Sequence, residues 1–189
     1  MRPLIVTEFV TLDGVMEAPG GEPSHPHSGW VGDYAGPEQT AWKLAEVREA
    51  GALLLGRVTY EGFAAAWPAR EGEFADVMNS IPKHVVTSTL ADPLEWSNAT
   101  VLGGDLATGV GRLKAEDGGP VLVAGSGTLV HALIERDLVD ELRLMVFPVI
   151  VGGGLRVFPE DLRKAPFEPA GAETFASGVT VQTYRRPGA

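Results

Sequence analysis

The sequence predicts a three-layer α/β domain in which a mostly parallel central sheet ends in antiparallel C-terminal strands. Short apolar, β-branched runs alternate with helical patterns over roughly the first 140 residues, as in parallel strands joined by crossover helices. The C-terminal part instead carries two strand patterns in succession, separated by a Ser-Gly turn. The 189 residues, 44% of them hydrophobic, suit one domain with a sizeable core, spanning 1–189.

The first part of the chain predicts a strand, a long connection and a helix. Residues 4–12, "LIVTEFVTL", are apolar and β-branched, which indicates a buried strand. Residues 13–37 are dense in glycine and proline, and connections this long inside a domain are often functional lids. Residues 38–50 carry a helical pattern. The apolar face of that helix would comprise Ala41, Leu44 and Ala45.

The rest of the chain continues the alternation and then becomes rich in strands. The predicted strands lie at 52–56, 83–90, 99–104, 120–125, 141–150, 167–176 and 179–185. The predicted helices lie at 57–67, about 105–115, and 126–141. In the last helix the apolar stripe would comprise Val130, Leu133, Ile134 and Leu138. Ser177-Gly178 predicts the turn of the closing hairpin, which would add an antiparallel edge.

The composition argues against several kinds of partner. The formal net charge is −10 and basic residues form no cluster beyond short pairs such as Arg185-Arg186 at the tail, so we expect no nucleic-acid partner. No run of about 18 apolar residues occurs, so we expect no membrane-spanning helix. The N-terminus, "MRPLIVTEFV", does not resemble a signal peptide, and the absence of cysteine excludes disulfides and thiolate catalysis. These features favour a cytoplasmic protein that acts on a small molecule.

Ligands of parallel α/β sheets bind at the carboxyl ends of the strands. The residues that follow the predicted strands are rich in Gly, Ser and Thr, and one of them is an arginine. Backbone N–H groups, hydroxyls and a guanidinium are the groups that bind phosphate. The segments concerned are Thr11 to Met16, Gly56 to Thr59, Thr87 to Thr89, Gly103 to Asp105, and Gly125 to Leu129.

The run Gly56-Arg57-Val58-Thr59 joins a predicted strand directly to a predicted helix. Gly56 allows a sharp turn, and the first N–H groups of the helix would favour an anion. Arg57 could then give a bidentate contact to a phosphate. Alternatively, Arg57 is a solvated side chain that pairs with Glu61, four residues later.

Two further strand ends offer weaker signals. Gly125-Ser126-Gly127-Thr128 connects a clear strand to a clear helix and could hold a phosphate. It is not a full G-x-G-x-x-G motif, and an ordinary strand–helix turn also favours glycine. Thr87-Ser88-Thr89 supplies three hydroxyls, although Ser and Thr favour turns in general.

The connection at 13–37 holds the remaining candidates. His25 and His27 could suggest a metal pair, but no cysteine and no clear third ligand accompany them, so we expect no metal site. Trp30 could stack on a flat heterocycle, or it could anchor the loop over apolar surface. Asp33 is a nearby carboxylate, and Asp13 begins the connection in what could be a simple turn.

Together these motifs resemble the dihydrofolate reductase-like family, and most closely its branch that contains the reductase domain of bacterial riboflavin biosynthesis (the RibD C-terminal domain). The matching segments occur in the same order over nearly the whole chain. They are "TLDGVM", "LLLGRVTYE", "KHVVTST", "VLGGDL" and "VLVAGSGTLVHALIERDLVDELRLMVFPVIVGGGLRVF". The last segment is the most specific, because it combines Gly-Ser-Gly-x-Leu, "LVDELRL", Pro148 and three consecutive glycines.

This resemblance implies a reductase that uses NADPH. The substrate would be small, polar and heterocyclic, either of the riboflavin-pathway type, as in 5-amino-6-(5-phosphoribosylamino)uracil reductases, or pterin-like. The Gly-Arg-x-Thr element would contact the phosphates, the glycine-rich turn the pyrophosphate, and the loop after the first strand the nicotinamide. The implied cofactor-binding residues are Thr11, Gly14, Val15, Met16, Gly56, Arg57, Val58, Thr59, Thr87, Ser88, Gly125, Ser126, Gly127, Thr128 and Leu129.

The substrate side departs from the folate reductases of this family. Those enzymes carry an acidic residue in the helix before the Gly-Arg-x-Thr strand, and here Glu38 and Asp33 are the nearest candidates for the catalytic acid or water organiser. Asp13 and Trp30 are the candidates for substrate binding. A basic cluster for a substrate phosphate is missing, apart from Arg156.

Two alternatives stay open, and the resemblance adds an expectation about assembly. The chain could be a non-catalytic nucleotide or small-molecule binding protein of the same fold. It could also be a reductase that uses a flavin or deazaflavin. Members of this branch commonly pair, so we expect a homodimer.

Overall fold

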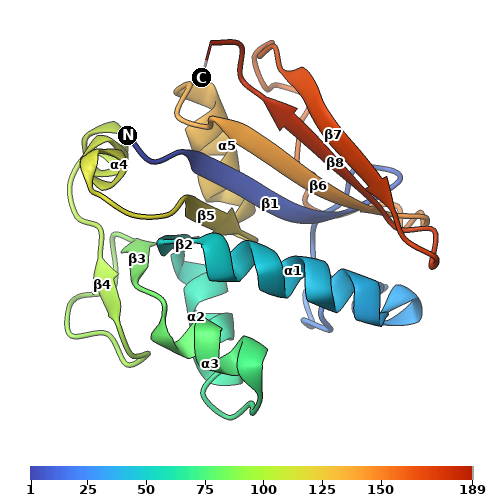
Figure 1. The fold of residues 1–189 in the computed structure, drawn as a ribbon, viewed down its shortest axis with the longest axis horizontal. Helices are drawn as coiled ribbons and strands as arrows, with labels where there is room; N and C mark the ends of the chain where they lie inside the picture. The colour runs from blue at the N-terminus through green and yellow to red at the C-terminus, as the bar shows by residue number, and fades with distance from the viewer. Residues whose placement is uncertain (189) are drawn as a thin grey trace.

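The computed structural model describes residues 1–188 as an eight-stranded sheet with helices on both faces (Figure 1). The strands are β1 (Leu4–Thr11), β2 (Ala52–Gly56), β3 (Lys83–Val86), β4 (Ala99–Val101), β5 (Val121–Ala124), β6 (Glu141–Phe147), β7 (Glu168–Thr174) and β8 (Thr180–Arg185). The helices are α1 (Pro37–Glu49), α2 (Arg57–Ala66), α3 (Glu73–Ser80), α4 (Leu106–Ala115) and α5 (Gly127–Glu135), with a short 3₁₀ helix at Gly32–Tyr34. Ala189, the last residue of the predicted domain, lies outside the described residues.

The strand order is β4-β3-β2-β5-β1-β6-β8-β7, and this arrangement confirms the predicted fold class. Strands β1 to β6 are parallel wherever they pair with one another, whereas β8 is antiparallel to both β6 and β7. Gly178 has a φ of +83° and donates to the carbonyl of Phe175, so the closing hairpin turns where the sequence predicts. No helix of the described chain is both long and apolar enough to cross a membrane.

The alternation of side chains along β1 divides the core into two layers. Leu4 and Val6 pack with apolar residues of α4 and α5 on one face of the sheet. Ile5 packs with apolar residues of α1, α2 and α3 on the other. Both faces are therefore covered, which explains why the parallel strands appear in the sequence as continuous apolar runs.

Several predicted boundaries are wrong because local hydrogen bonds end the elements early. The strand predicted at 83–90 ends at Val86, since the Thr87 hydroxyl accepts from the N–H groups of Thr89 and Leu90 and turns the chain. The helix predicted at 126–141 ends at Glu135, where the Leu138 N–H returns to the Leu133 carbonyl. Helix α3 was not predicted.

The predicted buried face of α1 is also wrong. Ala41 and Ala45 are exposed, and the residues buried against the sheet include Gln39 and Glu46 together with Val47. The helix thus turns a largely polar side toward the sheet.

Candidate functional site

The turns that follow β2 and β5 lie side by side at the carboxyl edge of the sheet. From β2 the chain proceeds through α2 toward β3, and from β5 it proceeds through α5 to β6 on the far side of β1. The two helices cover opposite faces, so β2 and β5 flank a point where the winding of the sheet reverses (Figure 1). Such points are the usual ligand sites of open α/β sheets.

Ser126 joins these two turns. Its hydroxyl oxygen accepts from the Gly56 N–H at 2.9 Å and donates to the Ala124 carbonyl at 3.2 Å. Its own N–H donates to Oγ1 of Thr59 at 2.8 Å. The structure therefore brings together two motifs that lie 70 residues apart in the sequence.

The helices that begin at these turns have no side-chain cap within the described chain. Neither α2 nor α5 has a hydrogen bond from an N-cap side chain, whereas Asp105 caps α4 by accepting from the Thr108 N–H at 2.9 Å. First-turn N–H groups that have no cap are available to water or to an anionic ligand. Helices α2, α4 and α5 each begin shortly after a parallel strand at this edge. Of these three, α2 and α5, which meet at Ser126, have no side-chain cap.

Arg57 lies at the first position of α2 and forms the ion pair that the sequence left as an alternative. Its Nη1 is 2.8 Å and 3.1 Å from the two carboxylate oxygens of Glu61. Both side chains are nearly half exposed, so the pair contributes at most about 1 kcal/mol and a phosphate could replace the carboxylate. Val58, next to it, is 71% exposed.

The hydroxyl segment after β3 is less directly connected to these turns. Thr87 uses its Oγ1 within its own turn, and Ser88 is exposed. Both residues follow β3, which is the neighbour of β2 in the sheet. They remain candidates for the far end of an extended ligand.

Glu8, which the sequence analysis missed, lies beneath the glycine-rich turn. One of its carboxylate oxygens accepts from the Gly125 N–H at 3.0 Å, while Oε1 is buried and has no partner among the described residues. Burial raises the pKa of Glu8 well above 4.5, and the opposing effects of Lys43 and the Gly125 N–H are smaller. A single glutamate in an apolar strand gives no sequence signal that it lies under the glycine-rich turn.

Asp13 connects the loop after β1 to the glycine-rich segment after β6. Its carboxylate accepts from Thr11 Oγ1 at 2.6 Å and from the Gly152 N–H at 2.9 Å. Burial acts to raise the pKa of Asp13, but the hydrogen bonds from Thr11, Gly152 and Val151 outweigh it and lower the pKa. Asp13 therefore organises this loop, in which Val15 and Met16 are buried.

Leu155 and Met16 cover the start of α5. A Cβ on Gly127 would collide with the Leu155 side chain and lie 3.1 Å from the Met16 sulfur. Gly127 is therefore needed for close packing of this loop on the helix. Thr128 is exposed and Leu129 is buried in the core.

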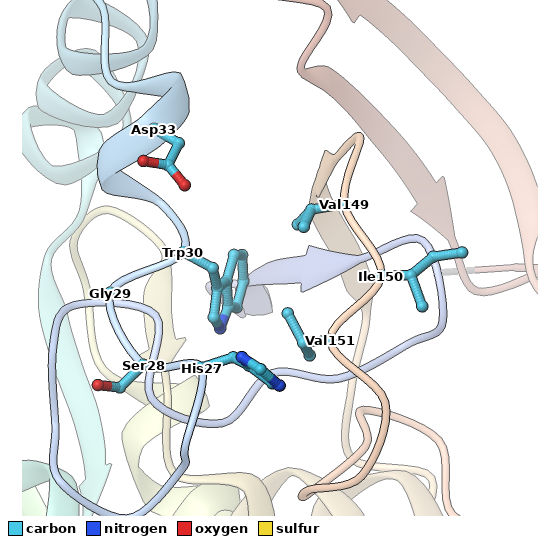
Figure 2. Close-up of a pocket in the computed structure, with 8 residues that line it drawn as sticks. All are labelled: His27, Ser28, Gly29, Trp30, Asp33, Val149, Ile150 and Val151. Atoms are coloured by element: carbon cyan, nitrogen blue, oxygen red, sulfur yellow. The ribbon is translucent and has the colours of Figure 1, made fainter.

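A cavity of about 360 Å³ lies between the predicted lid and the segment after β6 (Figure 2). In Figure 2, Trp30 faces Val149 and Val151, with Asp33 on one side and His27 on the other. Trp30 is 4% exposed, donates from its indole N–H to the Glu17 carbonyl and packs edge-on against Phe147. These contacts support the anchoring role of Trp30.

The two histidines of the lid have different environments. His25 is buried, with Nε2 2.7 Å from the Gly153 carbonyl and Nδ1 accepting from the His27 N–H. His27 lines the cavity with its exposed side chain. Among residues 1–188 no group of three or more His, Cys, Asp or Glu side chains could hold a metal.

The two predicted acids do not lie together. Asp33 is exposed and lines the cavity just described. Glu38 is exposed at the start of α1 and accepts from the Ala176 N–H at 2.9 Å, so it attaches this helix to the β7–β8 hairpin.

A buried polar layer, comprising Thr7, Gln39, Lys43, Glu46 and Arg143, lies between α1 and strands β1 and β6. The Lys43 ammonium is 2.7 Å from both Thr7 Oγ1 and Glu46 Oε2. The second Glu46 oxygen accepts from Arg143 at 3.1 Å. The sequence pattern did not indicate this layer, because the face of α1 predicted to be buried consists of two alanines and a leucine.

Comparison with known proteins identifies relatives over nearly the whole chain. A family model described as the RibD C-terminal domain matches residues 2–181. Two proteins of Bacillus subtilis (strain 168) are similar over 97% of this chain. "Uncharacterized protein YyaP" is 25% identical over 188 residues and 94% of its length, and "Uncharacterized protein YwjB" is 23% identical over 186 residues and 98% of its length.

A solved structure shows the same fold. It is described as a "Putative riboflavin biosynthesis protein" from Shewanella sp. PV-4, and it aligns with a TM-score of 0.77 at 23% identity. The alignment covers 98% of this chain and 99% of that chain.

Proposed function

This chain belongs to the RibD C-terminal domain family, and from that premise we propose that it is an NADPH-dependent reductase. Its substrate would be a small polar heterocycle of the riboflavin-pathway or pterin type. The observation that carries the proposal is the joined pair of uncapped turns, in which Ser126 connects Gly56 to the start of α5.

The donor set at these turns fits a dinucleotide diphosphate. Two helix N-termini offer unsatisfied N–H groups at one sheet edge, and each favours an anion through its dipole. The hydrogen bond between Thr59 and Ser126 fixes the position of the two turns relative to each other. Both turns would therefore contact the ligand without rearrangement. This set would bind the pyrophosphate at 125–129 and the adenosine end near 57–59 and 87–88.

Arg57 would select NADPH over NADH. Within residues 1–188 its one carboxylate contact is the exposed pair with Glu61, and a 2′-phosphate offers a guanidinium a stronger, bidentate partner. On a chain with a net charge of −10, such a cation is the specific attraction that an anionic cofactor requires.

The chemistry would come from the bound cofactor, which supplies a hydride to an electron-poor carbon of the substrate. The protein would orient the two molecules and exclude water. The loop after β1, fixed by Asp13, would lie along the nicotinamide, and the lid would cover the substrate.

The proposal is tested by titrating the purified protein with NADPH and, in parallel, with NADH, while following nicotinamide fluorescence. Arg57→Ala should weaken NADPH binding about 10- to 100-fold, in line with the loss of a charged hydrogen bond, and leave NADH binding unchanged. Arg112→Ala, an exposed arginine of α4, is the matched control. Equal NADPH affinity in all three proteins would refute the role of Arg57, and no binding of either nucleotide would refute the proposal itself.

The same purified protein distinguishes the alternatives. A visible chromophore that remains bound through purification would indicate a flavin- or deazaflavin-using reductase. Tight NADPH binding without oxidation against pterins, pyrimidines and carbonyl compounds would indicate a binding protein that lacks reductase activity.

We also propose that the chain forms a homodimer through its C-terminal strands. All seven residues of β7 are exposed, and this strand forms one edge of the sheet. An edge strand presents unpaired backbone groups that a second copy can use. Light scattering should give twice the chain mass of 20.0 kDa, and a monomer at micromolar concentration would contradict the proposal.

A further inference from the structure

Helix α1 contacts the sheet through polar side chains where an apolar stripe is normal. Gln39, Lys43 and Glu46 follow one another at intervals of four and three residues, so they lie on one helical face. Gln39 and Glu46 are 6% and 4% exposed, and the Lys43 side chain is 13% exposed. Burying such groups opposes folding unless each finds a partner. Stability alone therefore does not explain why α1 buries a polar layer against the sheet.

Two groups in this layer have unused hydrogen-bonding capacity. Lys43 carries three donors, and Thr7 and Glu46 accept two of them among the described residues. The side-chain oxygen of Gln39 is buried without any partner there. One donor and one acceptor thus remain for a ligand on the same face of α1.

The polar layer lies next to the proposed cofactor turn. Thr7 is in register with Ala124, the residue immediately before Gly125. Helix α1 starts after the loop that leaves the carboxyl end of β1 and ends before the amino end of β2, so Gln39 is the member of the layer nearest the carboxyl edge. Lys43 donates to Thr7, so its ammonium lies on the face of β1 opposite Glu8, beside the strand residue that pairs with Ala124.

We infer that Lys43 donates the proton in the proposed reduction and that Gln39 binds the polar edge of the substrate. The inference rests on the proposed function and specifies its substrate side. A carbon of a C=N or C=O group gains the hydride, with two electrons, from the reduced nicotinamide. The adjacent nitrogen or oxygen gains the proton from the Lys43 ammonium. NADPH becomes NADP⁺, and the neutral Lys43 amine regains a proton from water.

The surroundings of Lys43 suit this role. Glu46 and Thr7 fix the ammonium, and Arg143 holds the second oxygen of Glu46, so the donor is oriented before substrate arrives. The rings of Phe9 and Trp42 lie 5.2 Å and 5.5 Å from the ammonium. A planar ring with an amide-like edge matches these neighbours, since Gln39 can both accept from and donate to such an edge.

The carboxylates expected to act as the acid have other contacts. Glu38 accepts from the hairpin, and Asp33 is exposed and lines the cavity beside Trp30. Neither carboxylate belongs to the polar layer, whereas Lys43 is at its centre.

The test compares Lys43→Met, Lys43→Arg and Lys43→Ala with wild type, after circular dichroism has shown that each is folded. NADPH oxidation is measured against a panel of pterins, pyrimidines and carbonyl compounds. Binding of NADPH, and of the best panel compound in the presence of NADP⁺, is measured separately. Lys114→Met is the matched control, because Lys114 is also ion-paired and its side chain is 16% exposed.

The expected result is a loss of about 100-fold or more in kcat for the Met and Arg variants, a typical size for a lost general acid, with the NADPH dissociation constant unchanged. Added methylamine should restore part of the activity of Lys43→Ala and none of that of Lys43→Arg.

Failure of the inference can be told from failure of the proposed function. Turnover of a panel compound with equal kcat for Lys43→Met and Lys114→Met overturns the inference and leaves the reductase proposal in place. Bound NADPH without turnover of any compound overturns both the inference and the catalytic proposal. Absence of NADPH binding removes the premise of both.

Discussion

The hydroxyl oxygen of Ser126 accepts a hydrogen bond from the backbone N–H of Gly56 across 70 residues of chain. The same residue donates its N–H to Thr59, so one serine holds the starts of α2 and α5 together. A ligand that contacts both helices depends on this geometry.

Ser126→Ala should weaken NADPH binding and lower stability together. The partly buried Gly56 N–H would lose its acceptor, which costs about 1–3 kcal/mol in the free energy of unfolding. Because the hydroxyl that joins the two turns would be missing, their relative position would no longer be fixed. We therefore expect roughly a tenfold rise in the NADPH dissociation constant. Urea denaturation and NADPH titration measure the two effects. Ser177→Ala, in the exposed hairpin turn, is the control, and equal behaviour of the two variants would contradict the prediction.

Glu8→Gln should remove part of the pH dependence of stability. Burial raises the pKa of Glu8 in the folded protein well above 4.5, its ordinary value. At a pH between these two values, the native state therefore holds a proton that the unfolded state has lost. The contribution of Glu8 to the free energy of unfolding is therefore fully present below pH 4.5. It declines as the pH rises, by up to about 1.4 kcal/mol per pH unit. Lys43 and Glu46 act on Glu8 with opposite signs and are unchanged in the variant.

The measurement is the free energy of unfolding of both proteins from pH 5 to pH 7.5. Glu8→Gln should gain stability relative to wild type as the pH increases. A difference that stays constant across this range would show that Glu8 does not titrate as predicted.

Two glycines of α4 should respond in opposite directions to alanine. Gly111 has open space around its missing Cβ, so Gly111→Ala should stabilise the protein by about 0.5–1 kcal/mol. A Cβ on Gly109 would lie 3.0 Å from Leu102 Cγ, and Gly109→Ala should therefore give no gain or a loss. Urea midpoints of the two variants decide this, and equal stabilisation would contradict the packing of α4 on Leu102.

Lys83→Met should destabilise the protein although the lysine is remote from the proposed site. The ammonium donates to the carbonyls of Asn79, Ile81 and Ser97 at 2.8–3.0 Å, and burial lowers the pKa of Lys83 to about 8. Three carbonyls would lose a donor, for a loss of about 3 kcal/mol. Lys164→Met, at an exposed position, should change stability by less than about 0.5 kcal/mol in the same denaturation experiment.

The sheet could be predicted because buried parallel strands are continuous apolar runs. "LIVTEFVTL", "ALLLG" and "VLVAG" all correspond to strands of the structure. Helix α3 escaped prediction because its eight residues bury only Ala75 and Met78 completely. The strand order was not predictable from the pattern, since nothing local indicates that β5 inserts between β1 and β2.

The candidate site was also predictable only in part. Glycine, serine and threonine at strand ends marked Gly56 to Thr59 and Gly125 to Leu129, because anion-binding turns need those residues locally. Glu8 and Lys43 gave no signal, since their importance depends on contacts with distant segments. The amphipathic rule also misled the assignment of α1, because it assumes that the buried side of a helix is apolar.

The position of β5 sets an order of events during synthesis. Strands β1 and β2 are both complete by residue 56, yet the strand that lies between them arrives only at 121–124. A nascent chain must therefore keep two apolar strand edges apart, or cover them, while residues 57–120, about a third of the protein, are translated. Ser126 follows β5 by two residues, so closure of the sheet and completion of the paired turns occur nearly together. A truncated chain that ends before β5 would expose both edges and be prone to aggregation.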